Sequence, residues 1–569
     1  MSGRILTRAG TALLLLVFVG LHGAAIFTVA FNWDEFATFD RVARSLHDGL
    51  LRASAHAGLT EIVLSPFVEG CRDEIAVGRA ARGVWLGLTL LYLAGIAALL
   101  AELLRESPRR LHDTALGVAL LGLLPAFLEW SLQVRSDHIA LVGASWGGAA
   151  LLASRRRPAL ALCAGLGFGV GWLSSQKAAY VGALVALLAL AQLLERREWR
   201  PRRELVRGAL AVGVFCAVVF GYAAAIGSAF TLPENHPTGA VPEPALVKRH
   251  LDVFAHYRRT IGYRQYVELL PTLIPHFALL GLLVAATAVA LKRRAQRARV
   301  AVAWAVLALG AAVGAFHAAA FAYFWLTLGL FPALALALAL APIRGLVFAQ
   351  RARWLQPAGA VLWIALALPA ALQAPALLLD TQAVQRESLT FVHRNFSPSQ
   401  AGFQPERALF CGASQPFGGW MSFNIYEHFG GEQREANTRS LLARFREEPL
   451  HYLVQSFRLN QFPVELRRFW ADNYQPYRAS VFVAGRRLAG ARGEARTFDI
   501  VVPGLYRWLP VGNPLPVRID GRVIEAAATL ALGRGEHEAS FLEDTSSGLL
   551  VLALNDPPGP APLAFYKTY

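Results

Sequence analysis

Long apolar runs dominate the first two thirds of the chain and alternate with polar connectors. A helix that crosses a lipid bilayer needs roughly 17 to 25 mostly apolar residues. Eleven runs approach that length, at residues 11–31, 83–104, 113–132, 137–153, 158–174, 177–195, 206–228, 267–291, 299–317, 320–342 and 355–374. The pattern predicts a polytopic α-helical membrane protein with about eleven transmembrane helices.

Two of the connectors are long, at residues 32–82 and 229–266. The first predicts a short amphipathic helix, followed by a second helix near residues 55–68. The apolar face of that first helix consists of Phe36, Phe39, Val42, Ala43 and Leu46. The other connector is rich in proline early and in arginine and tyrosine later.

The pattern changes after residue 375, where long apolar runs stop. Residues 376–495 alternate strand-like and helix-like stretches, which predicts an α/β subdomain. Residues 496–569 alternate short strands with Gly, Pro and Asp turns, which predicts a small β-sandwich. The chain therefore divides into a transmembrane domain over residues 1–375 and two C-terminal subdomains.

Composition supports the membrane class. Charged residues make up 17% of the chain, below the usual quarter or so of soluble proteins, and the mean hydropathy is +0.41. The net charge of +16 does not indicate nucleic-acid binding, because arginines cluster in alternate connectors as the positive-inside rule requires. This asymmetry predicts a cytoplasmic N-terminus and an extracytoplasmic C-terminal domain.

The first apolar run admits a second interpretation, since small residues at its end would suit a cleaved signal peptide. Its apolar run is too long for a typical signal peptide, which favours an uncleaved anchor. The Arg-rich and Ala-rich composition is typical of a bacterial chain, so we expect the bacterial cytoplasmic membrane. Cys71 and Cys411 would share the outer side, but the sequence alone does not favour a disulfide between them.

In this topology the unusual polar residues gather at the outer surface. They are Asp34, Glu35, Arg135, Asp137, His138, Lys177, His317 and Tyr323. Ionisable groups at membrane depth are costly and usually functional. The inner side, by contrast, carries mostly arginine anchors. The sequence therefore predicts a functional site at the outer membrane surface.

Each of these residues also has an ordinary structural interpretation. Asp34 suits a catalytic base and could instead be a solvated helix end, whereas Glu35 could be catalytic, supporting or merely exposed. Arg135 and Asp137 could form a structural ion pair. Lys177 could bind phosphate or extend to the membrane interface.

The remaining candidates are less specific. Arg258 and Arg259 lie among tyrosines and could bind a phosphate or simply face solvent. His138, His317 and Tyr323 would support the site.

No metal-ligand spacing occurs among the cysteines. Asp34, Glu35 and Asp137 could hold a divalent metal, but a phosphate would already have basic partners, so we expect no metal or other cofactor.

Several signatures of other enzymes are missing from the sequence. It contains no Walker A loop, no His-Glu-x-x-His and no Gly-x-Ser-x-Gly elbow. The glycine-rich stretches at residues 143–148 and 165–171 lie inside predicted helices. They therefore indicate close helix packing and not a nucleotide site.

Three short segments together resemble the GT-C superfamily of membrane glycosyltransferases. They are Asn32-Trp33-Asp34-Glu35-Phe36, Val134-Arg135-Ser136-Asp137-His138, and Phe321-Ala322-Tyr323-Phe324-Trp325 followed by Pro332. The order of these segments over residues 10–375 is most similar to the protein O-mannosyltransferases and the lipid A aminoarabinose transferases. The resemblance implies inverting transfer of a sugar from a polyprenyl-phosphate donor to a glycan, lipid or protein hydroxyl.

The physical interpretation of the residues agrees with that implication. One general base is enough for single-step inversion, and Asp34 is the candidate. A departing phosphate needs cations, and Lys177, Arg135, Arg258 and Arg259 are the candidates. Two other functions stay open, a transporter or flippase of lipid-linked sugars and a non-catalytic envelope assembly protein.

Overall fold

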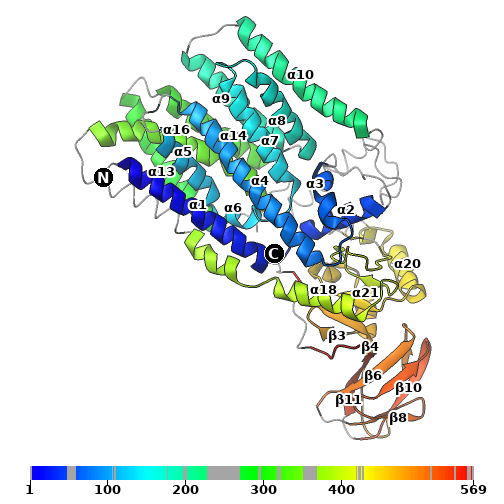
Figure 1. The fold of residues 1–569 in the computed structure, drawn as a ribbon. Helices are drawn as coiled ribbons and strands as arrows, with labels where there is room; N and C mark the ends of the chain where they lie inside the picture. The colour runs from blue at the N-terminus through cyan, green and yellow to red at the C-terminus, as the bar shows by residue number, and fades with distance from the viewer. Residues whose placement is uncertain are drawn as a thin grey trace. The chain divides into compact units, whose positions relative to one another are not determined.

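The computed structural model describes most of the chain in two compact units (Figure 1). The described residues are 3–47, 59–105, 107, 110–175, 177–196, 201–226, 270–292, 297–316, 322–349, 368, 370–417, 419–420, 425, 428–512, 515–543, 546–559 and 565–566. The helical unit comprises Met1–Val29, Ser45–Pro66 and Arg79–Leu379. The mixed unit comprises Ala30–Arg44, Phe67–Gly78 and Asp380–Tyr569.

The helices of the helical unit follow most of the predicted apolar runs. They are α1 (Gly3–Thr28), α3 (Leu59–Val68), α4 (Glu74–Leu103), α5 (Arg110–Gly122), α6 (Pro125–Trp130), α7 (Ser136–Ala153), α8 (Leu160–Ser174), α9 (Ala178–Arg196), α10 (Pro201–Ile226), α13 (Leu270–Lys292), α14 (Arg297–Phe316), α15 (Trp325–Leu328) and α16 (Leu330–Ala349). The first turn of α4 belongs to the mixed unit. The helices α7, α8 and α9 thus match the predicted runs 137–153, 158–174 and 177–195 closely.

Two predicted spans are interrupted. The run 113–132 is broken between α5 and α6, because Pro125 stands at the start of α6 and lacks the N–H that a continuous helix needs. The run 320–342 begins as a 3₁₀ turn at Ala322–Phe324, continues as the short helix α15 and restarts as α16. Most of the run 355–374 lies outside the described residues.

Length and hydropathy identify three described helices that could each cross a membrane: Glu74–Leu103, Arg202–Tyr222 and Arg297–Ala315. A fourth span results if the bent pair Leu15–Thr28 and Trp33–His47 counts as one. The chain is thus a multi-pass membrane protein by this criterion, and the number of eleven spans stays a prediction.

Small residues let α7 and α8 approach closely. An ideal Cβ atom on Gly143 would lie 2.5 Å from the carbonyl oxygen of Gly167, and one on Gly167 would lie 2.6 Å from the carbonyl oxygen of Gly143. A side chain at either position would force the helices apart. The prediction that these glycines serve helix packing is therefore confirmed.

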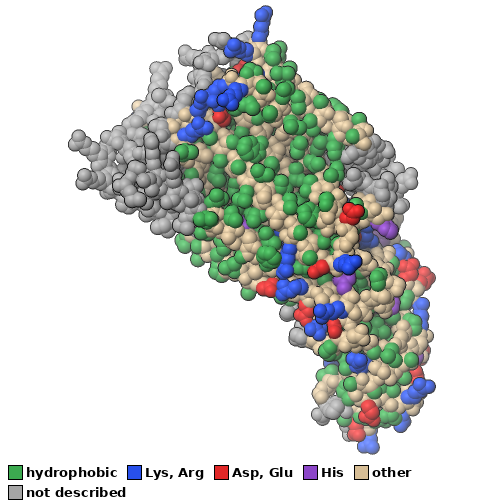
Figure 2. Space-filling model, viewed as in Figure 1, with side chains coloured by type: hydrophobic (Ala, Val, Ile, Leu, Met, Phe, Trp, Pro, Cys, Tyr) green, Lys and Arg blue, Asp and Glu red, His purple; other side chains and the backbone are tan. Residues whose placement is uncertain are grey.

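Hydrophobic side chains cover most of the visible face of the helical unit, whereas charged side chains are spread over the visible face of the mixed unit (Figure 2). On α10, Leu205 and Phe220 are 75% and 69% exposed. Such large apolar groups suit a lipid environment far better than water. The surface of the helical unit is therefore consistent with a membrane location.

The mixed unit combines helices with two sheets. Its helices are α2 (Trp33–His47), α18 (Ala383–Asn395), α20 (Arg434–Glu447) and α21 (Val464–Asn473). The seven-stranded sheet has the order β1-β2-β4-β11-β6-β9 with β3 paired to β4, and the four-stranded sheet has the order β5-β10-β7-β8. A strand-rich C-terminal region is thus confirmed.

The strands of the large sheet are β1 (Gly402–Phe403), β2 (Tyr452–Val454), β3 (Tyr474–Arg478), β4 (Val481–Gly490), β6 (Gly504–Pro510), β9 (Thr529–Leu532) and β11 (Ser546–Leu552). Those of the small sheet are β5 (Ala495–Ile500), β7 (Val517–Ile519), β8 (Arg522–Ile524) and β10 (Gly535–Phe541). Among the described strands, β1 and β2 are the one pair that runs parallel. Because β4 pairs with both β2 and β11, the large sheet runs across the predicted boundary at residue 495.

A disulfide joins Cys71 to Cys411 across a sequence separation of 340 residues. The expectation that these cysteines do not pair is therefore wrong, because the chain folds Phe67–Gly78 together with its C-terminal residues. Next to the disulfide, the buried carboxylate of Glu74 accepts the N–H of Cys411 at 3.0 Å and hydrogen-bonds His393 Nε2 at 2.9 Å. This carboxylate links three chain segments.

The hydrogen bond to the Glu74 carboxylate raises the pKa of His393 above its ordinary value of 6.5, although partial burial opposes the shift. A raised pKa means that the folded protein binds this proton more tightly than the unfolded chain does. The resulting stabilisation is complete below the unfolded pKa and is lost as pH rises through the folded pKa. We therefore expect His393→Gln to lower the unfolding temperature at about pH 6 and to have little effect at about pH 9.

The measurement is thermal unfolding of the full-length protein in detergent, followed by intrinsic fluorescence across that pH range. Arg394→Gln is the matched control, because the neighbouring exposed arginine stays charged throughout. A pH-independent effect of His393→Gln would contradict the linkage.

Candidate functional site

The acidic pair lies in the first turn of α2, where the residues form a helix cap. The side-chain oxygen of Asn32 accepts the N–H of Asp34 at 3.0 Å, and the Glu35 carboxylate accepts the N–H of Asn32 at 2.8 Å. This reciprocal pair is a capping box, which satisfies N–H groups that the first turn leaves without helical partners. The cap fixes the start of α2 at Trp33.

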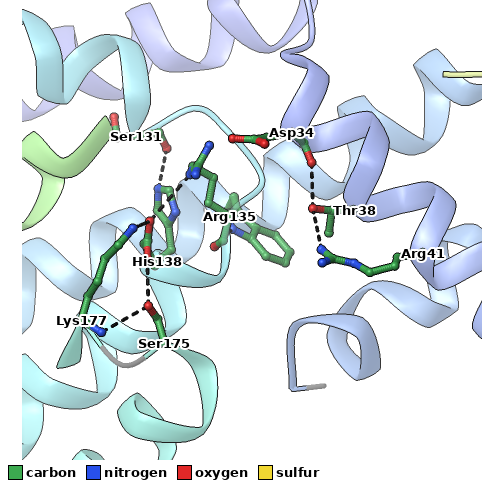
Figure 3. Close-up of polar contacts among 10 residues, drawn as sticks. Asp34, Thr38, Arg41, Ser131, Arg135, His138, Ser175 and Lys177 are labelled. Carbon is green, nitrogen blue, oxygen red and sulfur yellow. Dashed lines mark hydrogen bonds and ion pairs between the residues drawn. The ribbon is translucent and has the colours of Figure 1, made fainter. Parts of the chain in front are cut away.

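Glu35 and Asp34 have different environments within that turn. Glu35 is fully buried, whereas Asp34 is half-buried. The backbone carbonyl of Asp34 accepts the hydroxyl of Thr38, which in turn accepts a guanidinium N–H of Arg41 at 3.2 Å (Figure 3). A carboxylate at a helix N-terminus is favoured by the helix dipole. Asp34 is therefore the member of the pair with solvent access for chemistry.

A second polar cluster lies in the helical unit around Asp137, in the first turn of α7. Its carboxylate contacts Lys177 Nζ at 2.8 Å and Arg135 Nε at 3.7 Å, and it accepts the hydroxyl of Ser175 at 3.1 Å (Figure 3). The structure thus brings Lys177, which precedes α9, against Arg135 and Asp137 at the start of α7. Their ion pairs satisfy the requirement that buried charges be partnered.

The ring of Tyr323 packs against both cations of this cluster. The guanidinium carbon of Arg135 lies 3.6 Å from the ring centroid, and Lys177 Nζ lies 4.3 Å from it. Cations are attracted to the negative face of an aromatic ring. Two cations and one carboxylate give the cluster a formal excess of one positive charge. An arrangement of this charge can attract an anionic head group.

Buried hydrogen bonds hold the turn that carries Arg135. Trp85 donates its indole N–H to the Arg135 carbonyl at 2.8 Å, and His138 Nε2 donates to the Ser131 carbonyl at 3.0 Å. The Ser131 hydroxyl hydrogen-bonds His22 Nε2 at 2.7 Å. His138 therefore acts on the backbone before Arg135.

Sequence reasoning did not single out Ser131, Trp85 or Ser175 as parts of the site. Their partners are backbone groups or residues on other helices, which short sequence patterns do not reveal. His22 was detectable, because an imidazole inside an apolar run is costly and therefore informative.

Three predicted residues, Arg258, Arg259 and His317, lie outside the described residues. Asp34 and Glu35 belong to the mixed unit, and Arg135, Asp137, His138, Lys177 and Tyr323 belong to the helical unit. Within the described part of the chain, no group of three or more His, Cys, Asp and Glu side chains could hold a metal ion.

No protein-family model matches this chain, and no curated protein matches it. Two solved structures cover most of its length. An oligosaccharyltransferase from Archaeoglobus fulgidus, in complex with Zn and sulfate, aligns over 96% of this chain and 98% of its own, with a TM-score of 0.50 and 11% identity. ArnT from Cupriavidus metallidurans in the apo state aligns over 84% of this chain and 98% of its own, with a TM-score of 0.50 and 13% identity.

These alignments show that the chain has a GT-C-like fold, as its three short segments predict. The likeness extends to both the hydrophobic helices and the strand-rich C-terminal region. At 11% and 13% identity this likeness concerns the fold alone.

The capping geometry makes Glu35 replaceable by glutamine but not by alanine. Glutamine keeps an acceptor for the Asn32 N–H, whereas alanine removes it and leaves a cavity. We expect Glu35→Ala to cost about 1 to 3 kcal/mol of stability and Glu35→Gln much less. Thermal unfolding of both variants measures this difference, and equal losses would contradict the capping role.

Proposed function

We propose that the protein is an inverting glycosyltransferase that moves a sugar from a polyprenyl-phosphate donor to an acceptor hydroxyl at the outer face of the bacterial cytoplasmic membrane. The observation that carries this proposal is the cluster of Arg135, Asp137 and Lys177 over Tyr323, in a chain with a GT-C-like fold. A lipid-linked donor has its head group at the membrane interface, so its site must contain cations there.

The cluster suits a phosphate that leaves during the reaction. As the bond between sugar and phosphate breaks, negative charge grows on the phosphate oxygens, and fixed cations stabilise that charge. Lys177 and Arg135 supply the cations, and Asp137 holds both before donor binds. Arg258 and Arg259, which lie among tyrosines in the connector 229–266, are proposed as further phosphate-binding residues.

Asp34 is the proposed general base. Inversion in a single displacement requires one group that removes the proton from the acceptor hydroxyl as it attacks the sugar carbon. Asp34 is a half-buried carboxylate on a capped helix, which supports this role. Glu35 contributes through the cap, and His138, His317 and Tyr323 are supporting residues.

The acceptor is a glycan, lipid or protein that presents a hydroxyl group. Because Lys177 and Arg135 already offer positive charge to the phosphate, the proposed reaction needs no metal ion or other cofactor. The zinc in the archaeal oligosaccharyltransferase structure is a property of that protein. The boundary at residue 375 between a transmembrane domain and the C-terminal region is part of the same proposal, whereas the large sheet continues across residue 495.

We expect Asp34→Asn to lower transfer by at least about a hundredfold, because asparagine cannot accept the proton and general bases contribute on the order of 10² to 10⁴. Donor binding should persist. The assay follows radiolabelled sugar from a panel of polyprenyl-phosphate donors into membrane acceptors, with purified protein in lipid nanodiscs.

Asp73→Asn is the matched control, since Asp73 caps α4 through one oxygen, Oδ1, which accepts the N–H groups of Ile75 and Ala76 and which asparagine retains. Equal turnover in wild type and Asp34→Asn would remove Asp34 from the mechanism. Donor binding without turnover in either protein would favour the transporter.

We expect Lys177→Met to weaken binding of polyprenyl phosphate about tenfold, because one charge-assisted contact to the phosphate is lost. Lys177→Arg should retain most of the affinity. Binding is measured by quenching of intrinsic tryptophan fluorescence. The matched control is Lys292→Met, which removes an exposed lysine at the end of α13. Unchanged affinity in Lys177→Met would refute the phosphate-binding role.

A further inference from the structure

A buried arginine lies against the tryptophan that precedes Asp34. The guanidinium carbon of Arg458 is 4.1 Å from the ring centroid of Trp33, and the arginine is 1% exposed. A desolvated cation over an indole face is among the stronger cation–π contacts. Trp33 is the first residue of α2, so this contact acts directly on the turn that carries Asp34.

Polar groups of the mixed unit hold Arg458 in place. Its Nε lies 3.4 Å from a carboxylate oxygen of Glu406, and its Nη1 donates to the Trp420 carbonyl at 3.1 Å. The backbone N–H of Arg458 donates to the Ser456 hydroxyl, which itself donates to Glu406. Because these groups are buried, the guanidinium has little freedom to leave the Trp33 ring.

The same face of α2 makes further contacts within the mixed unit. The ring centroid of Phe36 lies 5.8 Å from that of Phe565, and the ring centroid of Phe39 lies 5.3 Å from that of Phe410. Asp40 pairs with Arg407 at 3.4 Å. Positions 33, 36, 39 and 40 form one stripe along a helix.

The chain that leads into α2 is also held. Gln385 is completely buried, accepts the Phe31 N–H at 2.7 Å and donates to the Phe31 carbonyl at 2.9 Å. The segment before the cap and the helix after it are thus both fixed by residues of the C-terminal region. Asp34 lies between these two attachments.

We propose that Arg458 is a positioning residue, which sets the place of the Asp34 carboxylate through its contact with Trp33. This inference rests on the proposed function, in which Asp34 is the base. A misplacement of a catalytic group by about 1 Å can cost on the order of a hundredfold in rate. The C-terminal region would then set the rate of transfer without contributing a group that touches substrate.

The first test uses Trp33→Leu, which removes the aromatic face, and Trp33→Phe, which keeps a weaker one. We expect Trp33→Leu to lower kcat about tenfold or more with little change in KM for the donor. Trp33→Phe should retain most of kcat. Loss of folded protein with an unchanged kcat per folded molecule would mean that the contact is only structural.

The second test addresses Arg458. Removing it alone would strand the buried carboxylate of Glu406, so the variant used is the double substitution Arg458→Met with Glu406→Gln. This double variant should lower kcat as much as Trp33→Leu does. The triple variant should show no further loss of kcat, because the double variant and Trp33→Leu remove the same contact between Arg458 and Trp33. Additive losses would overturn the inference, and Arg458→Lys should rescue part of kcat.

A third measurement separates this inference from the proposed function. Hydrogen exchange of the α2 amides in the full-length protein reports how firmly the first turn is held, without any assay of turnover. We expect faster exchange at residues 34–39 in Trp33→Leu and in the Arg458/Glu406 variant. A wild type that transfers no sugar overturns the proposed function, whereas unchanged exchange in both variants overturns the positioning role.

Discussion

A buried charge is stable in an apolar interior only when a charge of opposite sign lies beside it. Both units of this protein depend on a buried carboxylate that is paired with arginine or lysine. In the helical unit, Asp137 binds Lys177 and Arg135 together over one tyrosine ring. In the mixed unit, Glu406 binds Arg458, whose guanidinium also covers Trp33. Burial raises the pKa of Glu406, and Arg458 opposes that shift. Each proposed functional group is therefore fixed by an electrostatic requirement in addition to helix packing.

Parts of the first connector, residues 32–82, fold with residues that lie far away in the sequence. The connector follows the first apolar run, but Ala30–Arg44 and Phe67–Gly78 fold with residues after 380. Aromatic packing, the Gln385 contact and the disulfide all join these segments. The C-terminal region is consequently part of the framework of the acidic turn, and its proposed contribution to transfer is mechanical.

Local features of the sequence predicted much of this architecture. The helices α7 and α8 begin and end within about two residues of the predicted runs 137–153 and 158–174, because apolar length and flanking polar residues are local signals. The polar residues at 135, 137 and 177 stood out because charge is rare in apolar runs. Long-range features were not predictable: the pairing of β4 with β11, the disulfide and the contact of Arg458 with Trp33 join residues that no short pattern relates. The capping role of Glu35 was readable in principle, since Asn32 and Glu35 have capping-box spacing.

The long separation between Phe31 and Gln385, 354 residues, has a consequence for biosynthesis. A ribosome makes the acidic turn early and its supporting residues much later, at about 5 to 20 residues per second. The nascent chain therefore carries Asn32 to Phe36 for tens of seconds before Gln385, Arg458 and Phe565 exist. During that interval the first turn of α2 has its capping box but lacks these partners, and the proposed base acquires its final setting once the C-terminal region has been made. Translation order thus delays the onset of the proposed transfer until that region exists.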